Sequence, residues 1–404
     1  MKNCIVAQSG GPTSVINASA VGVLKANEEL KYYDNVYAGT HGIEGILNEA
    51  LINLSEIEPS VIDRLIYTPS SGLGSCRYKL KSFEDNKDEY THLFEIFKKY
   101  EIEAFFYIGG NDSMDTVNKL SKYAKEHNEN VKFFGIPKTI DNDLPSMDHT
   151  PGFGSAAKFI STIALENKLD ASVYTANTVF IIETMGRDTG WLAASSCVAT
   201  LNGKPAVDLI YLPEVAFDSE KFLSDVSKIL KTTSTAVIVV SEGIRTADGT
   251  FLGESAASGI DKFGHAQLGG VCGYLKNLIL DNGVCSKVRA IELSTMQRCA
   301  MHYASQTDID EAFKCGFEAL KYSKDGISGY MMAINRISNS PYKAEIIATP
   351  TSNVANTIKY FPKEWINSEG NNVTTEAYNY TLPLIQGEPN LIYKNGLPDF
   401  AVLK

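Results

Sequence analysis

The sequence contains no hydrophobic run long enough to cross a membrane. A bilayer-spanning helix needs about 20 consecutive apolar residues, and no part of the 404-residue chain forms such a run. The opening stretch MKNCIVAQSGG has too short an apolar run for a secretion signal. We therefore expect the N-terminus to belong to the fold, and we expect a cytoplasmic protein with no membrane partner.

Disulfide, zinc and dinucleotide signatures are also missing. The seven cysteines are scattered, form no CxxC pair and are odd in number, which is typical of reduced thiols in the cytosol. The histidines form no HxxxH or HExxH pattern, which argues against a histidine-bound zinc. No GxGxxG follows the first apolar run, which argues against a dinucleotide-dependent oxidoreductase.

Positive charge is in short supply. The chain has 37 Lys and Arg against 48 Asp and Glu, a formal net charge of −11. This balance disfavours a general attraction to nucleic acid or to anionic membranes. We therefore expect no nucleic-acid partner, while a local basic pocket stays compatible with the composition.

What is present is the pattern of an α/β protein. Hydrophobic residues make up 44% of the chain and charged residues 21%, as in ordinary globular proteins. Because single cores stop growing near about 250–300 residues, 404 residues predict two domains. Short apolar runs alternate with amphipathic segments, which indicates mainly parallel sheets. We predict strands at 3–8, 35–39, 103–109, 131–136, 178–183, 206–212 and 235–241, and a helix at 112–129. The interval 45–100 and the chain after 350 are weakly patterned, and we assign neither.

Polar, glycine-rich stretches follow four of the predicted strands. They read SGGPTS (9–14), GGNDS (109–113), PKTIDND (137–143) and TMGRDTGW (184–191). Ligands of open parallel sheets bind at the carboxyl ends of the strands, where glycines let backbone approach closely and helix starts offer N–H groups to an anion. Taken alone, SGGPTS is explained equally well by a tight turn near a helix start, and GGNDS is explained better by a turn with a helix cap.

The stretch PKTIDND is harder to explain structurally. Thr139, Asp141 and Asp143 fall at alternate positions, so they point one way if the segment is extended. Lysine, arginine and glycine-rich N–H groups together suit a transferable phosphate. Carboxylates beside them suit Mg²⁺ or a base that accepts the proton of an attacking hydroxyl. This stretch therefore predicts a phosphoryl-transfer site.

The order of these motifs resembles the phosphofructokinase family. The chain also has LGSCR (73–77), ETMGRDTGWLA (183–193), SEG (241–243) and RAIELSTMQR (289–298), so the resemblance runs from about residue 3 to 340. It implies phosphorylation of fructose 6-phosphate at the 1-hydroxyl with Mg²⁺ as cofactor. It also implies two three-layer αβα domains with mainly parallel sheets, and an active site shared between domains and subunits in a homodimer or homotetramer. Residues 1–152 plus about 297–346 would hold the donor, and 153–296 plus about 347–404 the sugar phosphate.

The resemblance also assigns roles to individual residues. Asp141 would be the general base, with Arg77, Lys138 and Asp112 also catalytic. Gly11, Gly110 and Lys138 would bind the donor, and Asn111, Asp112 and Asp143 the metal. The substrate-binding residues would be Thr139, Asp143, Met185, Gly186, Arg187, Glu242, Thr295, Arg298 and, from a neighbouring subunit, Arg289. The two arginines would clamp the 6-phosphate, which suits their planar fork of N–H donors.

Three positions favour pyrophosphate over ATP as the donor. The ATP-using branch usually reads GGDGS and PGTIDND, whereas this chain has Asp112 and Lys138 at the two variable positions. An aspartate side chain narrows the space for a nucleotide, and a lysine adds a charge for free pyrophosphate. Ile43 stands where the ATP branch commonly has an aromatic ring.

Other positions depart from the family pattern. Asn111 replaces a metal-binding aspartate, Thr295 replaces a histidine, and Asn177-Thr178 replaces an arginine of the phosphate clamp. Val21 and Lys25 stand where allosteric members have effector-binding arginines, so we expect little response to nucleotide effectors. Two alternative functions stay open: an ATP-dependent 6-phosphofructokinase, and a catalytically silent sugar-phosphate sensor.

Overall fold

The larger sheet of the protein is built mostly from the N-terminal part of the chain. The computed structural model describes residues 2–253 and 268–403. Seven strands run in the order β13 (Tyr342–Pro350), β12 (Tyr330–Asn339), β5 (Lys132–Pro137), β4 (Ile102–Gly109), β1 (Asn3–Gln8), β2 (Asn35–Gly39) and β3 (Leu51–Asn53). The neighbours from β12 to β2 are parallel, and only the edge strands β13 and β3 are antiparallel to their partners.

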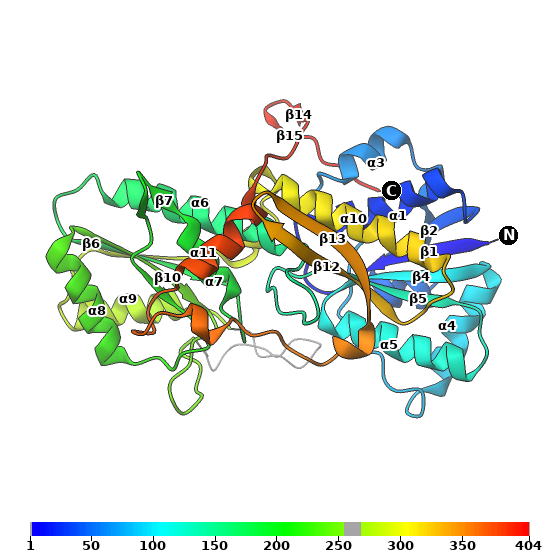
Figure 1. The fold of residues 1–404 in the computed structure, drawn as a ribbon, viewed down its shortest axis with the longest axis horizontal. Coiled ribbons are helices and arrows are strands. Elements are labelled where there is room, and N and C mark those ends of the chain that lie inside the picture. Colours follow the sequence, from blue (N-terminus) through cyan, green and yellow to red (C-terminus); the bar gives the residue numbers. More distant parts are fainter. Residues whose placement is uncertain (1, 254–267, 404) are drawn as a thin grey trace.

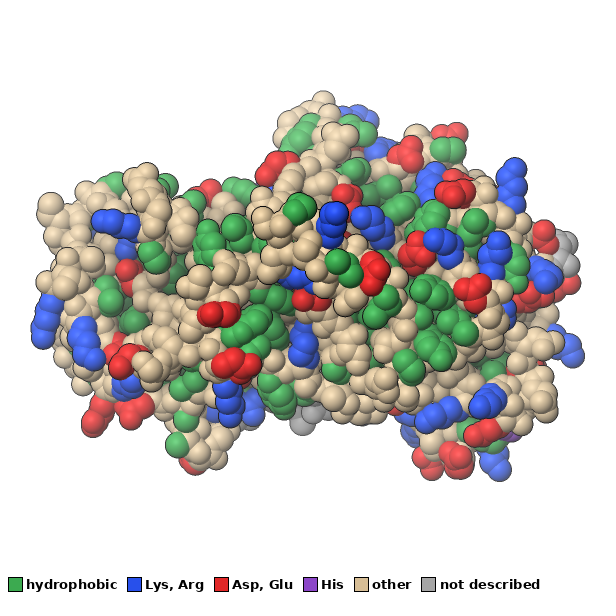
Figure 2. Space-filling view, viewed as in Figure 1, with side chains coloured by type: hydrophobic (Ala, Val, Ile, Leu, Met, Phe, Trp, Pro, Cys, Tyr) green, Lys and Arg blue, Asp and Glu red, His purple; other side chains and the backbone are tan. Residues whose placement is uncertain are grey.

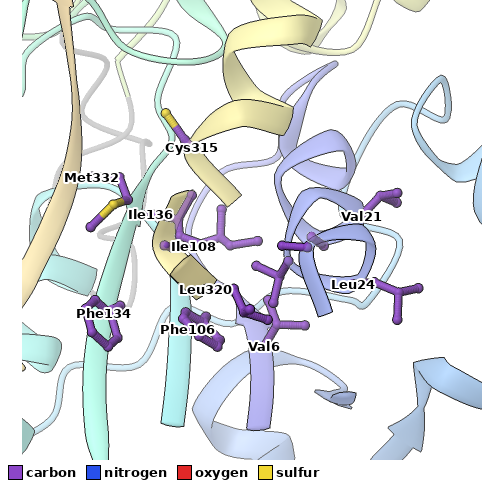
Figure 3. Packing of buried hydrophobic residues seen from close by; sticks show 14 of the residues in the cluster. Val6, Val21, Leu24, Phe106, Ile108, Phe134, Ile136, Cys315, Leu320 and Met332 are labelled. Atoms are coloured by element: carbon purple, nitrogen blue, oxygen red, sulfur yellow. The ribbon is translucent and has the colours of Figure 1, made fainter. Parts of the chain in front are cut away.

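Helices cover both faces of this sheet. Helices α1 (Ile16–Leu30) and α10 (Gln306–Ser323) lie on one face, while α4 (Lys87–Lys99) and α5 (Asn111–Glu126) lie on the other (Figure 1). Strand residues such as Val6, Phe106 and Phe134 pack against Leu24 and Leu320 from the first pair of helices (Figure 3). These strands are buried on both faces, which explains their nearly continuous apolar sequence. The short helices α2 (Gly42–Leu47) and α3 (Pro59–Leu65) complete this lobe.

The second lobe has a smaller parallel sheet. Its order is β11 (Val288–Glu292), β6 (Thr178–Thr184), β10 (Thr235–Ser241) and β9 (Leu209–Tyr211). One face packs on α6 (Phe153–Ala171) and α7 (Trp191–Ser195), the other on α8 (Ser219–Thr232) and α9 (Val271–Asp281). The two-stranded ribbons β7 (Thr200–Leu201) with β8 (Lys204–Pro205) and β14 (Tyr393–Lys394) with β15 (Leu397–Pro398) are peripheral. Helix α11 (Thr375–Thr381) lies in the C-terminal part of the chain.

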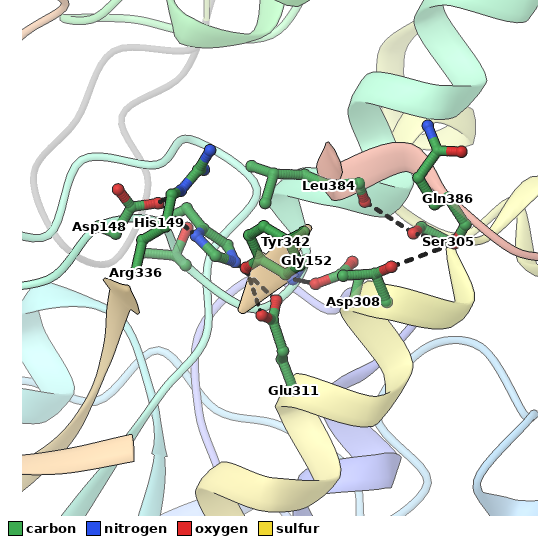
Figure 4. A network of polar contacts seen from close by, with 12 residues as sticks. Asp148, His149, Gly152, Ser305, Asp308, Glu311, Arg336, Tyr342, Leu384 and Gln386 are labelled. Carbon is green, nitrogen blue, oxygen red and sulfur yellow. Dashed lines mark hydrogen bonds and ion pairs between the residues drawn. The ribbon is translucent and has the colours of Figure 1, made fainter. Parts of the chain in front are cut away.

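A buried polar network joins the two lobes (Figure 4). His149 bonds Asp148 through Nδ1 and Glu311 of α10 through Nε2, both at 2.7 Å. The carboxylate of Asp308, on the same helix, accepts N–H bonds from Gly152 and Ser155 at 2.8 and 2.9 Å, at the start of α6. Helix α10 therefore fixes the first helix of the second lobe.

The structure confirms an α/β protein with mainly parallel sheets. Strands predicted at 3–8, 35–39 and 235–241 are observed with those bounds, and the helix predicted at 112–129 is observed as α5. The prediction of 206–212 is too long, since β9 covers only Leu209–Tyr211, and β3, β11, β12 and β13 were not predicted. The expected domain division stays a proposal. Because the first sheet runs through β13 to Pro350, we place the boundary after 350 rather than near 346.

The surface carries charges of both signs. On the face shown in Figure 2, Lys and Arg are interspersed with Asp and Glu instead of gathering on one lobe. None of the helices within residues 2–253 and 268–403 is both long and apolar enough to span a membrane.

Candidate active site

A polar cavity of about 460 Å³ opens where the loops after the parallel strands of the first lobe meet the second lobe. Most of the residues expected at the site line it: Gly11, Arg77, Gly110, Asn111, Asp112, Lys138, Thr139, Asp141, Asp143, Met185 and Arg298. These residues come from six segments that are far apart in the sequence. Their convergence follows from the parallel topology, which brings the carboxyl ends of β1, β4 and β5 to one edge.

The glycine pair after β1 makes room for two cations. Gly10 has a φ of +77°, and a Cβ there would lie 3.2 Å from Nζ of Lys138. A Cβ on Gly11 would lie 3.1 Å from a guanidinium nitrogen of Arg298. Glycine is therefore needed at 10 for its backbone conformation, and at both positions for the close approach of a positive side chain.

Lys138 is held at the centre of the site. Its side chain is only 3% exposed, and Nζ donates to the carbonyl oxygen of Gly11 at 2.5 Å. Its backbone N–H donates to Gly109 at 2.9 Å, which ties the end of β5 to the end of β4. Burial lowers the pKa of Lys138 to about 7, although the charge of Asp141 opposes this. Lys138 is therefore an ammonium donor whose charge depends on the anions around it.

The acidic residues of PKTIDND face the cavity together. Thr139, Asp141 and Asp143 all line it, while Asn142 between them is buried and bonds Tyr380 at 2.8 Å and Thr150 at 3.0 Å. The Asp141 N–H donates to Thr139 Oγ1 at 3.1 Å, which fixes the turn. The alternate spacing of these three residues thus places all of them on the same cavity, as the sequence predicts.

Burial makes these two carboxyl groups weakly acidic. Burial raises the pKa of Asp141, with Lys138 opposing the shift. Burial and then the negative charge of Asp141 raise the pKa of Asp143 to about 7. A cation bound beside the pair would relieve this repulsion.

Arg77 and Arg298 add positive charge to the same cavity. Burial, and then the charge of Arg77, lowers the pKa of Arg298. Both arginines also lower the pKa of Lys138. Three cations so close together repel one another, so their arrangement favours an anion between them.

The loops after β6 and β10 form the other side of the site. Met185 lines the cavity, and its N–H donates to Gln297 at 3.1 Å. Glu242 does not line the cavity but accepts the Gly186 N–H at 3.3 Å. Burial, and then the charge of Asp141, raises the pKa of Glu242 to about 7. Arg187 does not line the cavity either, and its carbonyl oxygen accepts a bond from Arg245 at 3.2 Å.

Two more of the expected residues, Arg289 and Thr295, are exposed and do not line the cavity within this chain. Arg289 is exposed on β11 and pairs with Asp170 at 3.0 Å. Thr295 is exposed on the turn that precedes Arg298. A role for Arg289 in a neighbouring subunit's site stays a proposal.

The cavity also contains residues that the sequence reasoning did not select. Ser9, Thr13 and Asp188 belong to motifs that were recognised, so closer reading of those motifs could have found them. Asn356 and Ile358 lie in the C-terminal part of the chain, where the sequence carries no periodic signal. Only the folded structure brings them to the site.

Comparison with known proteins places the chain in context. The family model described as Phosphofructokinase matches residues 3–322. A protein of Halomonas elongata described as pyrophosphate–fructose 6-phosphate 1-phosphotransferase is 42% identical, over 99% of this chain and 96% of its own length. A protein of Methylococcus capsulatus with the same description is 42% identical over 100% of this chain and 96% of its own length. The crystal structure of a pyrophosphate-dependent phosphofructokinase from Nitrosospira multiformis matches with a TM-score of 0.90 and 37% identity, covering 98% of this chain and 95% of that one.

Proposed function

The chain belongs to the phosphofructokinase family, and we propose that it transfers a phosphoryl group from pyrophosphate to the 1-hydroxyl of fructose 6-phosphate. The products are fructose 1,6-bisphosphate and phosphate, and the reaction is reversible. The full-length relatives described as pyrophosphate-dependent support this donor.

The observation that carries the proposal is the placement of Lys138 among the residues of the donor loops. Its Nζ reaches the carbonyl of Gly11, and it shares the cavity with Gly110 and Asp112. A buried ammonium group at this place neutralises a small, highly charged donor, while the side chain of Asp112 takes up space that a nucleotide would need. Both features are expected of a site for inorganic pyrophosphate.

Asp141 is the residue that we propose accepts the proton of the attacking hydroxyl. It lies in the cavity between Lys138 and the loops that hold Met185 and Glu242. We assign it as the general base that accepts the proton of the sugar 1-hydroxyl as that oxygen attacks the phosphorus. Lys138 and Arg77 stabilise the negative charge of the transferring phosphoryl group. Binding alone requires no such base, so Asp141 argues against a silent sensor.

The residues present fit a magnesium ion. Carboxylate oxygens are the ligands that Mg²⁺ prefers, and the repulsion between Asp141 and Asp143 favours a cation near them. Asp112 and Asp143 would hold it. When bound, Mg²⁺ would supply positive charge that stabilises the phosphate groups.

The sugar side of the site uses the second lobe. Thr139, Met185, Gly186, Arg187 and Glu242 contact the sugar in our proposal, and Arg298 binds its 6-phosphate. Arg289 of a neighbouring subunit completes this clamp in a homo-oligomer, with Thr295 beside it. We also propose that the enzyme works in the cytoplasm.

A donor assay tests the proposed function. The purified protein is incubated with fructose 6-phosphate and Mg²⁺ and with pyrophosphate, ATP or GTP, and fructose 1,6-bisphosphate is measured. We expect rapid turnover with pyrophosphate and little with either nucleotide. Rapid turnover with ATP and none with pyrophosphate would instead make the protein an ATP-dependent 6-phosphofructokinase.

A further inference from the structure

The side chain of Asn111 is committed to a distant part of the chain. Its Nδ2 donates to the carbonyl oxygens of Val354 and Thr357, at 3.1 and 2.6 Å. Its Oδ1 accepts the backbone N–H of Asn356 at 2.6 Å. One amide group therefore binds three backbone groups of a single tight turn.

The same helix holds this turn at a second point. Asp115 lies one turn further along α5, on the same side as Asn111. Its Oδ1 accepts Nδ2 of Asn356 at 3.2 Å, and its Oδ2 pairs with Lys119 at 2.6 Å. Asp115 is 8% exposed, so the carboxylate end of this contact is buried, while Asn356 itself is exposed. Asn356 has a φ of +60°, a conformation that such contacts must stabilise.

The segment then continues to the catalytic loop. The N–H of Lys359 donates to the carbonyl oxygen of Asp143 at 2.7 Å, and its Nζ donates to that of Asp148 at 2.7 Å. Trp191 of the second lobe donates its indole N–H to the Lys359 carbonyl at 3.1 Å. In Figure 1 the orange chain accordingly leaves β13, passes the start of α5 and crosses to the other lobe.

Between these attachments the segment faces the cavity. Asn356 and Ile358 line it together with Gly110, Asn111 and Asp112, the loop that approaches the donor. Residues 354–359 therefore form a wall of the donor side of the site. The position of this wall depends on Asn111 at one end and on the Asp143 loop at the other.

We infer that Asn111 is a positioning residue, not a metal ligand, and that it holds residues 354–359 as the wall of the pyrophosphate site. This inference rests on the proposed function. An amide can both donate to two carbonyls and accept an N–H, whereas an aspartate at this position could not donate. A carboxylate oxygen would instead face the carbonyl oxygens of Val354 and Thr357 and repel them.

The decisive variant is Asn111→Asp, because the two roles predict opposite results. As a positioning residue, Asn111 cannot be replaced by aspartate: the wall is released, and KM for pyrophosphate rises by about tenfold or more as two hydrogen bonds are lost. KM for fructose 6-phosphate changes much less. As a metal ligand, Asn111 would be improved by a negative charge, so the variant would need less Mg²⁺ and would keep its KM for pyrophosphate.

A readout without substrate or metal accompanies the kinetics. Hydrogen–deuterium exchange of the peptide that contains residues 354–358 is measured for the protein alone, because the Asn356 N–H donates to Asn111. We expect faster exchange in Asn111→Asp. Asn118→Asp makes the same chemical change on the same helix away from the cavity, and we expect it to behave like the unaltered protein in both measurements.

The outcomes separate the inference from the proposed function. If the unaltered protein does not use pyrophosphate, the proposed function fails, and the exchange result still decides whether Asn111 holds the segment. If the unaltered protein uses pyrophosphate and Asn111→Asp has the same KM and the same exchange, the inference is overturned. A further variant, Asn356→Gly, keeps the backbone N–H but loses the contact with Asp115, so we expect a smaller rise in KM.

Discussion

At the scale of single residues, the site depends on charges that are buried close to one another. Lys138 and Asp141 are three positions apart in the sequence and occupy the same cavity, and each shifts the pKa of the other toward its charged form. Removing either leaves its partner buried without its compensating charge. Substitutions at these positions therefore test the chemistry more directly than substitutions at the exposed rim.

Asp141→Asn removes the proposed base while keeping the shape of the side chain. We expect turnover to fall by about 10²–10⁴-fold, the usual contribution of a general base, with sugar-phosphate binding largely retained. Steady-state kinetics and calorimetric binding of fructose 6-phosphate measure the two effects. The exposed Asp281→Asn is the control, and an Asp141→Asn variant with normal turnover would refute the role of Asp141.

Lys138→Met replaces the buried ammonium group with an apolar chain of similar length. We expect kcat/KM for pyrophosphate to fall by about 10²–10³-fold, because a preorganised donor to the phosphate is lost. Lys122→Met, on the exposed side of α5, provides the matched control. Equal losses in both variants would mean that the effect does not come from the site.

At the scale of elements, two glycines let helices α1 and α10 touch backbone to backbone. A Cβ on Gly22 would lie 2.1 Å from the carbonyl oxygen of Phe313, and one on Gly316 would lie 1.9 Å from that of Ser19. Helix α1 begins just after the Gly10-Gly11 turn of the site. The closeness of the two helices therefore fixes the start of α1, and with it the Gly10-Gly11 turn of the proposed donor site.

Gly316→Ala should separate these helices. We expect the free energy of unfolding to fall by about 1–3 kcal/mol, because overpacking outweighs the better helix propensity of alanine. Gly273→Ala in α9 meets no atom within 4 Å, so there we expect a gain of about 0.5–1 kcal/mol. Urea unfolding of both variants checks this, and a stabilised Gly316→Ala would contradict the crossing seen here.

The elements that could be predicted from the sequence are the fully buried ones. Strands β1, β4 and β10 are apolar at nearly every position because helices cover both faces. Strand β13 alternates between half-buried and exposed residues at the edge of its sheet. Its sequence, YKAEIIATP, therefore lacks a long continuous apolar run and predicts no buried strand. A continuous apolar run therefore indicates a strand that is buried on both faces, and it does not identify strands at the edge of a sheet.

At the scale of the whole molecule, the network around His149 links the lobes through buried charge. Burial lowers the pKa of His149, but the carboxylates of Glu311 and Asp148 outweigh it and raise the pKa from 6.5 to about 9. Arg336 pairs with Asp148 at 2.7 Å, and Tyr342 donates to Glu311 at 2.5 Å. The imidazolium is therefore part of the junction between the first sheet and the second lobe (Figure 4).

This network predicts a dependence of stability on pH. Because the folded pKa of His149 lies above the unfolded value, its contribution is complete below about pH 6.5 and is lost as pH rises through about 9. The loss amounts to about 3 kcal/mol between pH 6 and 10. The test is to measure the free energy of unfolding between pH 6 and 10 for the unaltered protein and for His149→Gln. The variant His92→Gln, at an exposed histidine, is the control. A variant at His149 that keeps the full dependence would contradict the assignment.

The candidate site was predictable only where motifs carry it. The motifs PKTIDND and GGNDS predict that Asp141, Lys138 and Asp112 belong to the site, because in both motifs polar residues directly follow an apolar strand. The wall formed by residues 354–359 has no such signal, since its function depends on contacts with Asn111 and Asp143 that are distant in sequence. For the same reason, the sequence predicts Asn111 to be a metal ligand, whereas in the structure its side chain forms hydrogen bonds to residues 354–357.

The late position of that wall has a consequence for synthesis of the enzyme. Domains generally fold as the ribosome delivers them, N-terminal parts first. Strands β1, β4 and β5 and the loops that follow them are translated long before residues 356 and 358, which complete the cavity lining. A nascent chain can therefore display the loops proposed to bind the donor before it can enclose the donor, and full activity must await translation of the final part of the cavity.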